Sequence, residues 1–180
     1  MNDKITRDHL QRCAYVYIRQ STLHQVHHHL ESQRRQYDLQ LRAQELGFGR
    51  IEVIDEDLGI SGTGTQERLG FARLLKEFGS GQAGAVLALE ASRLARNNRD
   101  WHHLIDLCAQ THTLVIDTEG IYDPQILNDR LLLGLKGTMS EFELGLLRQR
   151  AQEAFRQKVH RGCVLFQVPI GYRRTENESV

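Results

Sequence analysis

A serine and several arginines in this sequence are spaced in a way that suits phosphate chemistry. The segment YIRQS at residues 17–21 contains Arg19 and Ser21, and the segment SRLAR at residues 92–96 contains Ser92, Arg93 and Arg96. Arg93 and Arg96 stand three residues apart. If this segment forms a turn or the start of a helix, we expect their side chains to point the same way. Paired, forked guanidinium groups are well suited to binding a phosphate.

Each of these segments directly follows a predicted strand. Apolar runs at Ala14–Ile18 and Ala83–Leu89 are typical of buried strands. In open α/β sheets, sites form just beyond the carboxyl ends of parallel strands, so both segments are candidates by position. Arg68, at the end of a segment rich in Gly, Ser and Thr, is a third possible phosphate contact. On residues 17–21 alone, a Ser/Arg pair that caps a turn is the simpler interpretation.

The residue types favour phosphoryl transfer over acyl transfer. A serine among arginines with no nearby histidine base makes a poor acyl-transfer triad, whereas the positive charge would stabilise a phosphorane. The sequence contains no Gly-rich Walker loop with its lysine and no carboxylate pair at metal spacing, so we expect neither a metal nor another cofactor. We interpret His24 and His28 as solvated or hydrogen-bonded side chains, and residues 55–57 as loop acids that could orient arginines.

The order of apolar segments predicts an α/β fold with a mainly parallel central sheet flanked by helices. The expected strands are Ala14–Ile18, Ile51–Ile54, Ala83–Leu89 and Leu114–Ile116. The expected helices are Glu31–Leu46, Leu69–Phe78 and Arg99–Ala109. Between the second strand and the second helix, residues 55–68 are acidic and then rich in Gly, Ser and Thr, which predicts a mobile surface loop.

A single long helix is expected from Ile126 to His160, because apolar residues recur every three or four positions without an interrupting proline. Its length of about 50 Å exceeds what one small domain covers, so part of it needs another partner. The run at residues 131–133 is apolar on more than one face and favours a subunit interface; a frayed or broken helix is the alternative. We therefore divide the chain into a core at 1–125, a long helix at 126–162 that takes part in an interface, and a linker at 163–180.

The amino-acid composition and the distribution of charge further restrict the kinds of protein that this chain can be. The 180 residues carry no formal net charge, and 40% of them are hydrophobic and 26% charged, which is typical of a globular domain. The last stretch, Arg148 to Val180, holds seven basic and three acidic residues, as in chains that keep a basic end for a polyanion. No run approaches the about 18 apolar residues of a membrane span, so we expect a cytoplasmic protein. The three cysteines are far apart and suggest reduced, buried thiols.

Taken together, these motifs resemble the catalytic domain of serine site-specific recombinases, the resolvases and invertases. The resemblance extends from about Cys13 to Gly162, and the ending resembles the entry to the additional domain of the large serine recombinases. It implies that the helix at 126–162 is a dimerisation helix that approaches DNA. It also implies that residues 163–180 are a linker toward a DNA-binding domain absent from this chain. The matching residues are Tyr17, Arg19 and Ser21; Gln33; Asp57, Gly59, Ser61 and Gly62; Arg68; and Ser92, Arg93 and Arg96. Many smaller members have an aspartate where this chain has Ser92, so no proton-transfer role is carried over to that position.

The resemblance implies a reaction and a set of roles. Ser21 would attack a DNA phosphodiester in line and form a 5′-phosphoserine bond, and reversal after strand exchange would rejoin the strands without metal or ATP. The resemblance assigns the scissile phosphate to Arg19, Arg68, Arg93 and Arg96. It assigns supporting roles to Gln33, Asp57, Ser92 and Arg150, and contacts with the DNA backbone to Arg156, Lys158 and Arg161.

The implied partner is double-stranded DNA, bound by a homodimer that pairs into a tetramer in synapsis, with no membrane and no small-molecule substrate. Two other functions stay open. A recombinase-like domain could act as a non-catalytic DNA-binding or oligomerisation regulator, although the intact set of Ser21 and arginines argues against this. A flavodoxin-like phosphohydrolase is disfavoured by the long helix with its basic end.

Overall fold

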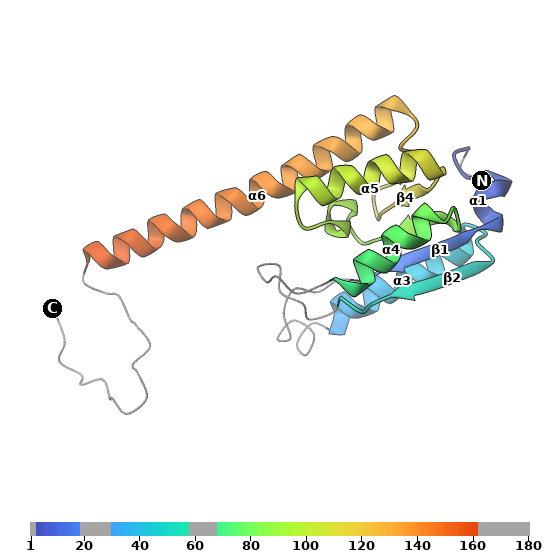
Figure 1. Cartoon of the computed structure of the whole chain (residues 1–180). Helices are drawn as coiled ribbons and strands as arrows, with labels where there is room; N and C mark the ends of the chain where they lie inside the picture. The colour runs from blue at the N-terminus through green and yellow to red at the C-terminus, as the bar shows by residue number, and fades with distance from the viewer. Residues whose placement is uncertain (1–2, 19–29, 58–67, 162–180) are drawn as a thin grey trace. The chain divides into compact units, whose positions relative to one another are not determined.

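The computed structural model describes residues 3–18, 30–57 and 68–161, with side chains described from residue 38 onward in the second range. The elements, in chain order, are α1 (Arg7–Gln11), β1 (Cys13–Tyr17), α3 (Leu30–Glu45), β2 (Arg50–Ile54), α4 (Leu69–Gly79), β3 (Ala83–Leu87), the 3-10 helix η1 (Ala91–Leu94), α5 (Asn98–Thr111), β4 (Leu114–Ile116), β5 (Ile121–Tyr122) and α6 (Leu127–His160). In Figure 1 the colour of the chain follows the residue number, as the bar shows, so the elements can be found in this order.

The strands form one mainly parallel sheet in the order β2-β1-β3-β4-β5. The pairs β1–β2, β1–β3 and β3–β4 are parallel, and only β4–β5 is antiparallel among the described strands. The carboxyl ends of β1 and β3 therefore lie at the same edge of the sheet. This confirms the predicted fold class. Tyr17 and Leu87, the last residues of β1 and β3, therefore lie on neighbouring strands at this edge.

The sheet is covered on both faces, so β1, β3 and β4 are apolar and buried throughout, whereas the edge strand β2 contains Arg50 and Glu52. On one face, Tyr15 and Tyr17 of β1 pack in a cluster with apolar side chains from α4, α5 and the start of α6. On the other face, Ala14 and Val16 pack in a second cluster with Leu39 and others from α3. The period of two along β1 is what sends neighbouring residues to opposite layers.

Three local features were not predicted from the sequence. Residues 7–11 form α1, whose start is closed by a capping box between Thr6 and His9. Residues 121–122 form β5, a two-residue edge strand too short for a periodic signal. Asp57, interpreted as a loop acid, is fully buried.

The predicted long helix is confirmed as α6, and its first turns are packed against α5. The indole of Trp101 donates a hydrogen bond of 2.9 Å to the carbonyl of Leu133. Gly137 lies against the same indole, where an added Cβ would come within 2.1 Å of a ring carbon. The apolar run at residues 131–133 therefore divides: Leu133 is buried in the chain's own core, whereas Leu131 and Leu132 are exposed.

The chain separates into two compact units, Met1–Met139 and Ser140–Val180, with the division inside α6. In the second unit, Phe142, Leu147 and Phe155 are exposed apolar side chains. The expected linker at 163–180 lies outside the described residues, and the predicted domain limits remain predictions. Among the helices described, none is both long enough and apolar enough to cross a membrane.

Candidate functional site

A buried carboxylate, Asp57, fixes the start of α4. One of its oxygens accepts a hydrogen bond from the amide of Gly70 at 3.1 Å, and the other accepts one from the amide of Phe71 at 3.0 Å. These are amides of the first turn of α4, which have no partner within a helix. The residue at the N-cap position, Arg68, makes no side-chain capping bond, so Asp57 satisfies these amides from a distant part of the chain. A negative charge is also favourable at a helix N-terminus.

Arg68 lies beside this carboxylate and is itself almost entirely buried. Its side chain is 8% exposed, with Nε 3.7 Å from Asp57 Oδ2 and Nη1 3.6 Å from Asp100 Oδ2. Its Nη2 donates to the carbonyl of Leu94 at 3.1 Å, and the guanidinium stacks at 4.0 Å over the ring of Phe71. Nε and Nη1 are buried and make no hydrogen bond among the described residues. Two of the three nitrogens of this buried guanidinium therefore meet carboxylate oxygens at ion-pair distance without forming a hydrogen bond.

Tyr17, the last residue of β1, connects these two charges. Its hydroxyl donates to Asp57 Oδ2 at 2.5 Å and accepts from Arg68 Nη2 at 2.8 Å. Burial raises the pKa of the Tyr17 phenol, while the Arg68 guanidinium works against that shift. The phenol is therefore protonated at neutral pH and serves as a fixed bridge rather than as a base.

The segment at residues 92–96 lies next to Arg68 through the bond to Leu94. Arg93 belongs to η1, and its exposed side chain pairs with Glu90 at 3.1 Å. Arg96 follows the end of η1, and its half-buried side chain has a buried Nε. Ser92 is half-buried. Because η1 ends at Leu94, the two arginines differ in exposure instead of forming a regular pair on one helix.

The structure thus brings together two of the predicted site elements, Asp57 and Arg68, beside the segment of Ser92, Arg93 and Arg96. Arg19 and Ser21 lie outside the described residues, directly after β1. Gln33 belongs to α3, and its side chain is not described. The remaining predicted residues, Arg150, Arg156, Lys158 and Arg161, are exposed in the second unit, and each stays a prediction there.

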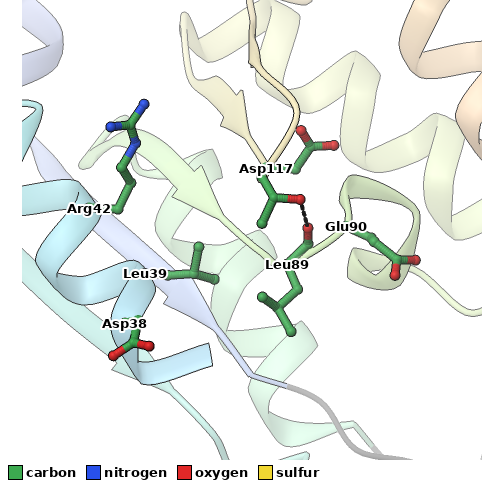
Figure 2. Close-up of a pocket in the computed structure, with 7 residues that line it drawn as sticks. Asp38, Leu39, Arg42, Leu89, Glu90 and Asp117 are labelled. Carbon is green, nitrogen blue, oxygen red and sulfur yellow. Dashed lines mark hydrogen bonds between the residues drawn. The ribbon is translucent and has the colours of Figure 1, made fainter. Parts of the chain in front are cut away.

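Two carboxylates near this edge of the sheet were not predicted from the sequence. Asp100, in the first turn of α5, faces Arg68, but nothing in its local pattern marks it. Asp117 directly follows β4, so the rule of strand carboxyl ends, applied to β1 and β3 only, would have found it. It lines a pocket of about 550 Å³ between α3 and the ends of β3 and β4. Figure 2 shows Asp38 and Leu39 on one side and Glu90 and Asp117 on the other.

Guanidinium groups near this edge of the sheet are of the type that binds an anion. Arg68 and Arg93 supply guanidinium groups near one sheet edge, and the buried Asp57 keeps Arg68 in place. The described parts of the chain hold no cluster of three or more His, Cys, Asp or Glu side chains that could bind a metal ion. Among the described residues, these guanidinium groups are the ones that could stabilise negative charge.

Comparison with known proteins identifies a family. Residues 14–164 match the family model described as resolvase, N terminal domain. The chain is 51% identical over 179 residues to the uncharacterized protein y4bA/y4pH of Sinorhizobium fredii (strain NBRC 101917 / NGR234), an alignment that covers 98% of this chain. The chain spans 26% of the length of that relative.

Two solved structures share the fold. A resolvase family site-specific recombinase from Streptococcus pneumoniae superposes with a TM-score of 0.54 at 24% identity, covering 83% of this chain and 99% of that one. The N-terminal catalytic domain of TP901-1 integrase superposes with a TM-score of 0.52 at 23% identity, covering 75% of this chain and 98% of that one. At these identities the likeness concerns the arrangement of sheet and helices.

Proposed function

The chain belongs to the resolvase family, and on that premise we propose that it is the catalytic domain of a serine recombinase that cuts and rejoins double-stranded DNA. Ser21 is the proposed nucleophile. Its Oγ forms a bond to the phosphorus of a DNA phosphodiester as the bond from phosphorus to the 3′ oxygen breaks. The serine proton leaves, the 3′ oxygen gains a proton, and the 5′ end stays attached to the protein.

Rejoining is the reverse of this step. After the cut ends exchange places, a 3′ hydroxyl attacks the phosphoserine and releases Ser21. Because the phosphodiester energy is conserved in the covalent bond, the reaction consumes no nucleotide. The proposed reaction requires no metal or cofactor.

The observation that carries this proposal is the bond from Arg68 to the carbonyl of Leu94. It joins the start of α4 to the segment that contains Arg93 and Arg96, although Arg68 and Leu94 are 26 positions apart in the sequence. Tyr17 ties the same guanidinium to the end of β1, directly before Arg19 and Ser21. We propose that the four arginines surround the scissile phosphate and stabilise its developing negative charge.

The supporting residues have different roles in this scheme. Asp57 orients Arg68 and closes the start of α4, and its burial makes it a rigid anchor. Gln33 and Ser92 are proposed to support the phosphate contacts. Arg150 is proposed as a further active-site or interface arginine. No general acid or base is assigned.

We further propose that α6 pairs two copies of the chain and leads toward DNA. Its second unit exposes Phe142, Leu147 and Phe155, and such apolar side chains are favoured at protein interfaces. Arg156, Lys158 and Arg161 near its end suit the phosphate backbone. Dimers of this kind would pair into a tetramer during strand exchange.

The test uses the full-length protein and DNA that spans the ends of the genomic element encoding it, incubated with EDTA and separated on a denaturing gel. A covalent protein–DNA band is expected from the wild type and from Ser140→Ala, and none from Ser21→Ala. Only strands labelled at the 3′ end should shift, because the protein is attached to the 5′ end of the cut.

Three results would contradict the proposal. A band that persists in Ser21→Ala would remove Ser21 as nucleophile, and a shift of strands labelled at the 5′ end would reverse the polarity of the attack. Absence of the band, with binding to the same DNA demonstrated, would favour a non-catalytic DNA-binding regulator.

A further inference from the structure

Asp117, at the carboxyl end of β4, joins three parts of the first unit. Its Oδ1 accepts hydrogen bonds from the amides of Glu119 and Gly120, both at 2.9 Å, which closes the turn before β5. Its Oδ2 accepts from the amide of Ala91 at 3.3 Å, and Ala91 is the first residue of η1. Only 1% of the Asp117 side chain is exposed, so this carboxylate needs a positive partner.

Lys136 of α6 supplies that partner. Its ammonium lies 2.8 Å from Asp117 Oδ2 and 2.7 Å from Glu119 Oε2, and it stands 5.1 Å from the centre of the Tyr122 ring. Burial lowers the pKa of the Lys136 ammonium, but the hydrogen bonds to Asp117 and Glu119 outweigh burial and raise it. The ammonium is therefore charged at every pH at which the protein would act.

The same Asp117 oxygen faces α6 and η1 at once. Oδ2 is shared between Lys136 Nζ and the amide of Ala91. Without the ammonium, the buried carboxylate would have to take up a proton or turn toward water, because an uncompensated buried charge is costly. Either response weakens the bond to Ala91, and η1 carries Ser92 and Arg93.

We propose that Lys136 is a positioning residue, which acts through Asp117 to hold η1 and its arginine in the geometry that the phosphate site requires. The proposal rests on the proposed recombinase function. It makes α6, the helix proposed to pair two copies, also the helix that fixes one wall of the phosphate site. A shift of α6 relative to the sheet would then change the position of Arg93 on η1.

A second ion pair provides a matched control for the docking of α6. Arg130 of α6 pairs with Asp106 of α5, and both side chains are about half exposed. This pair connects α6 to the core without involving η1. Replacing Arg130 removes a helix-to-core contact, whereas replacing Lys136 removes a helix-to-core contact and the countercharge of Asp117.

The experiment measures amide hydrogen exchange in the whole chain for wild type, Lys136→Met, Lys136→Arg and Arg130→Met. In Lys136→Met, exchange at Ala91 and across residues 88–96 should rise about tenfold, because local opening controls exchange. Lys136→Arg should restore the protection, since a guanidinium can still pair with Asp117. In Arg130→Met the same residues should exchange as in wild type.

Formation of the covalent DNA complex gives the functional half of the test. Lys136→Met should slow it by about tenfold with DNA affinity unchanged, and Lys136→Arg should recover most of the rate. Wild-type exchange in Lys136→Met, or equal loss of protection in Arg130→Met, would overturn the positioning role. If wild type itself forms no covalent complex, the recombinase proposal fails, while hydrogen exchange still decides whether Lys136 holds η1.

Discussion

Asp57 and Arg68 form a buried ion pair in which Arg68 Nε lies 3.7 Å from Asp57 Oδ2. The carboxylate is fully buried, and it also binds two amides at the start of α4. The pair therefore links the segment after β2 to the helix that follows it, across residues 58–67. The ion pair thereby fixes Arg68, one of the arginines of the proposed phosphate site.

Asp57→Asn should destabilise the protein strongly. The substitution keeps the shape of the side chain but leaves Arg68 without its fully buried countercharge, a loss of about 3 to 5 kcal/mol in the free energy of unfolding. Asp100→Asn is the matched control, because Asp100 is partly exposed and lies 3.6 Å from the same guanidinium; it should cost less than about 1 kcal/mol. Urea unfolding measures both. Equal losses for the two variants would contradict the role given to Asp57.

Tyr17→Phe should cost about 1 to 3 kcal/mol in the free energy of unfolding, because it leaves buried hydrogen-bonding groups of Asp57 and Arg68 unpaired. Its effect should depend on pH. Burial raises the pKa of the folded Tyr17 phenol above the value of about 10 for an unfolded tyrosine, so its stabilisation is complete below pH of about 10 and is lost as pH rises further. Urea unfolding near pH 8 and near pH 11 gives the decrease in the free energy of unfolding between these two pH values. This decrease should be smaller in Tyr17→Phe than in wild type. A pH dependence identical to that of wild type would rule out this role for the hydroxyl.

Alanine substitutions at two glycines of α6 should have opposite effects on the stability of the chain. At Gly137 an added Cβ would meet the Trp101 ring at 2.1 Å, so Gly137→Ala should destabilise the chain by about 1 to 3 kcal/mol. At Gly134 nothing lies within 4 Å of an added Cβ, so Gly134→Ala should stabilise the helix by up to about 1 kcal/mol. Thermal unfolding of the two variants gives the comparison. A stabilising Gly137→Ala would mean that Trp101 does not pack there.

Leu147→Glu should weaken self-association if α6 pairs two copies of the chain. Leu147 is 60% exposed on α6, and Leu41 is 58% exposed on α3, so Leu41→Glu introduces the same charge at equal exposure. Burying a carboxylate in an apolar interface is unfavourable, and we expect the dimer dissociation constant to rise about tenfold or more in Leu147→Glu only. Sedimentation equilibrium measures this constant. An equal effect in both variants would point to a general charge effect instead of an α6 interface.

Local patterns in the sequence were sufficient for the fold class. The continuous apolar run of β1, the period of three to four along α6 and the alternation of short apolar runs with amphipathic segments are properties of neighbouring residues, so they can be read without tertiary contacts. The rule that parallel strands end at one edge then placed the segments after β1 and β3 together. The motifs around Ser21, Arg68 and Arg93 were enough to indicate the family.

Tertiary structure decided which charged groups meet. Asp57 looked like a loop acid because its neighbours are polar and Gly-rich, yet packing of α4 on the sheet buries it beneath Arg68. The pairing of Asp117 with Lys136 depends on where α6 docks, which no local pattern contains. The sequence alone thus determined the main elements other than α1 and β5, their order and the chemical types available. The contacts among those types were decided by packing, because a buried charge must find its partner wherever the fold brings one within reach.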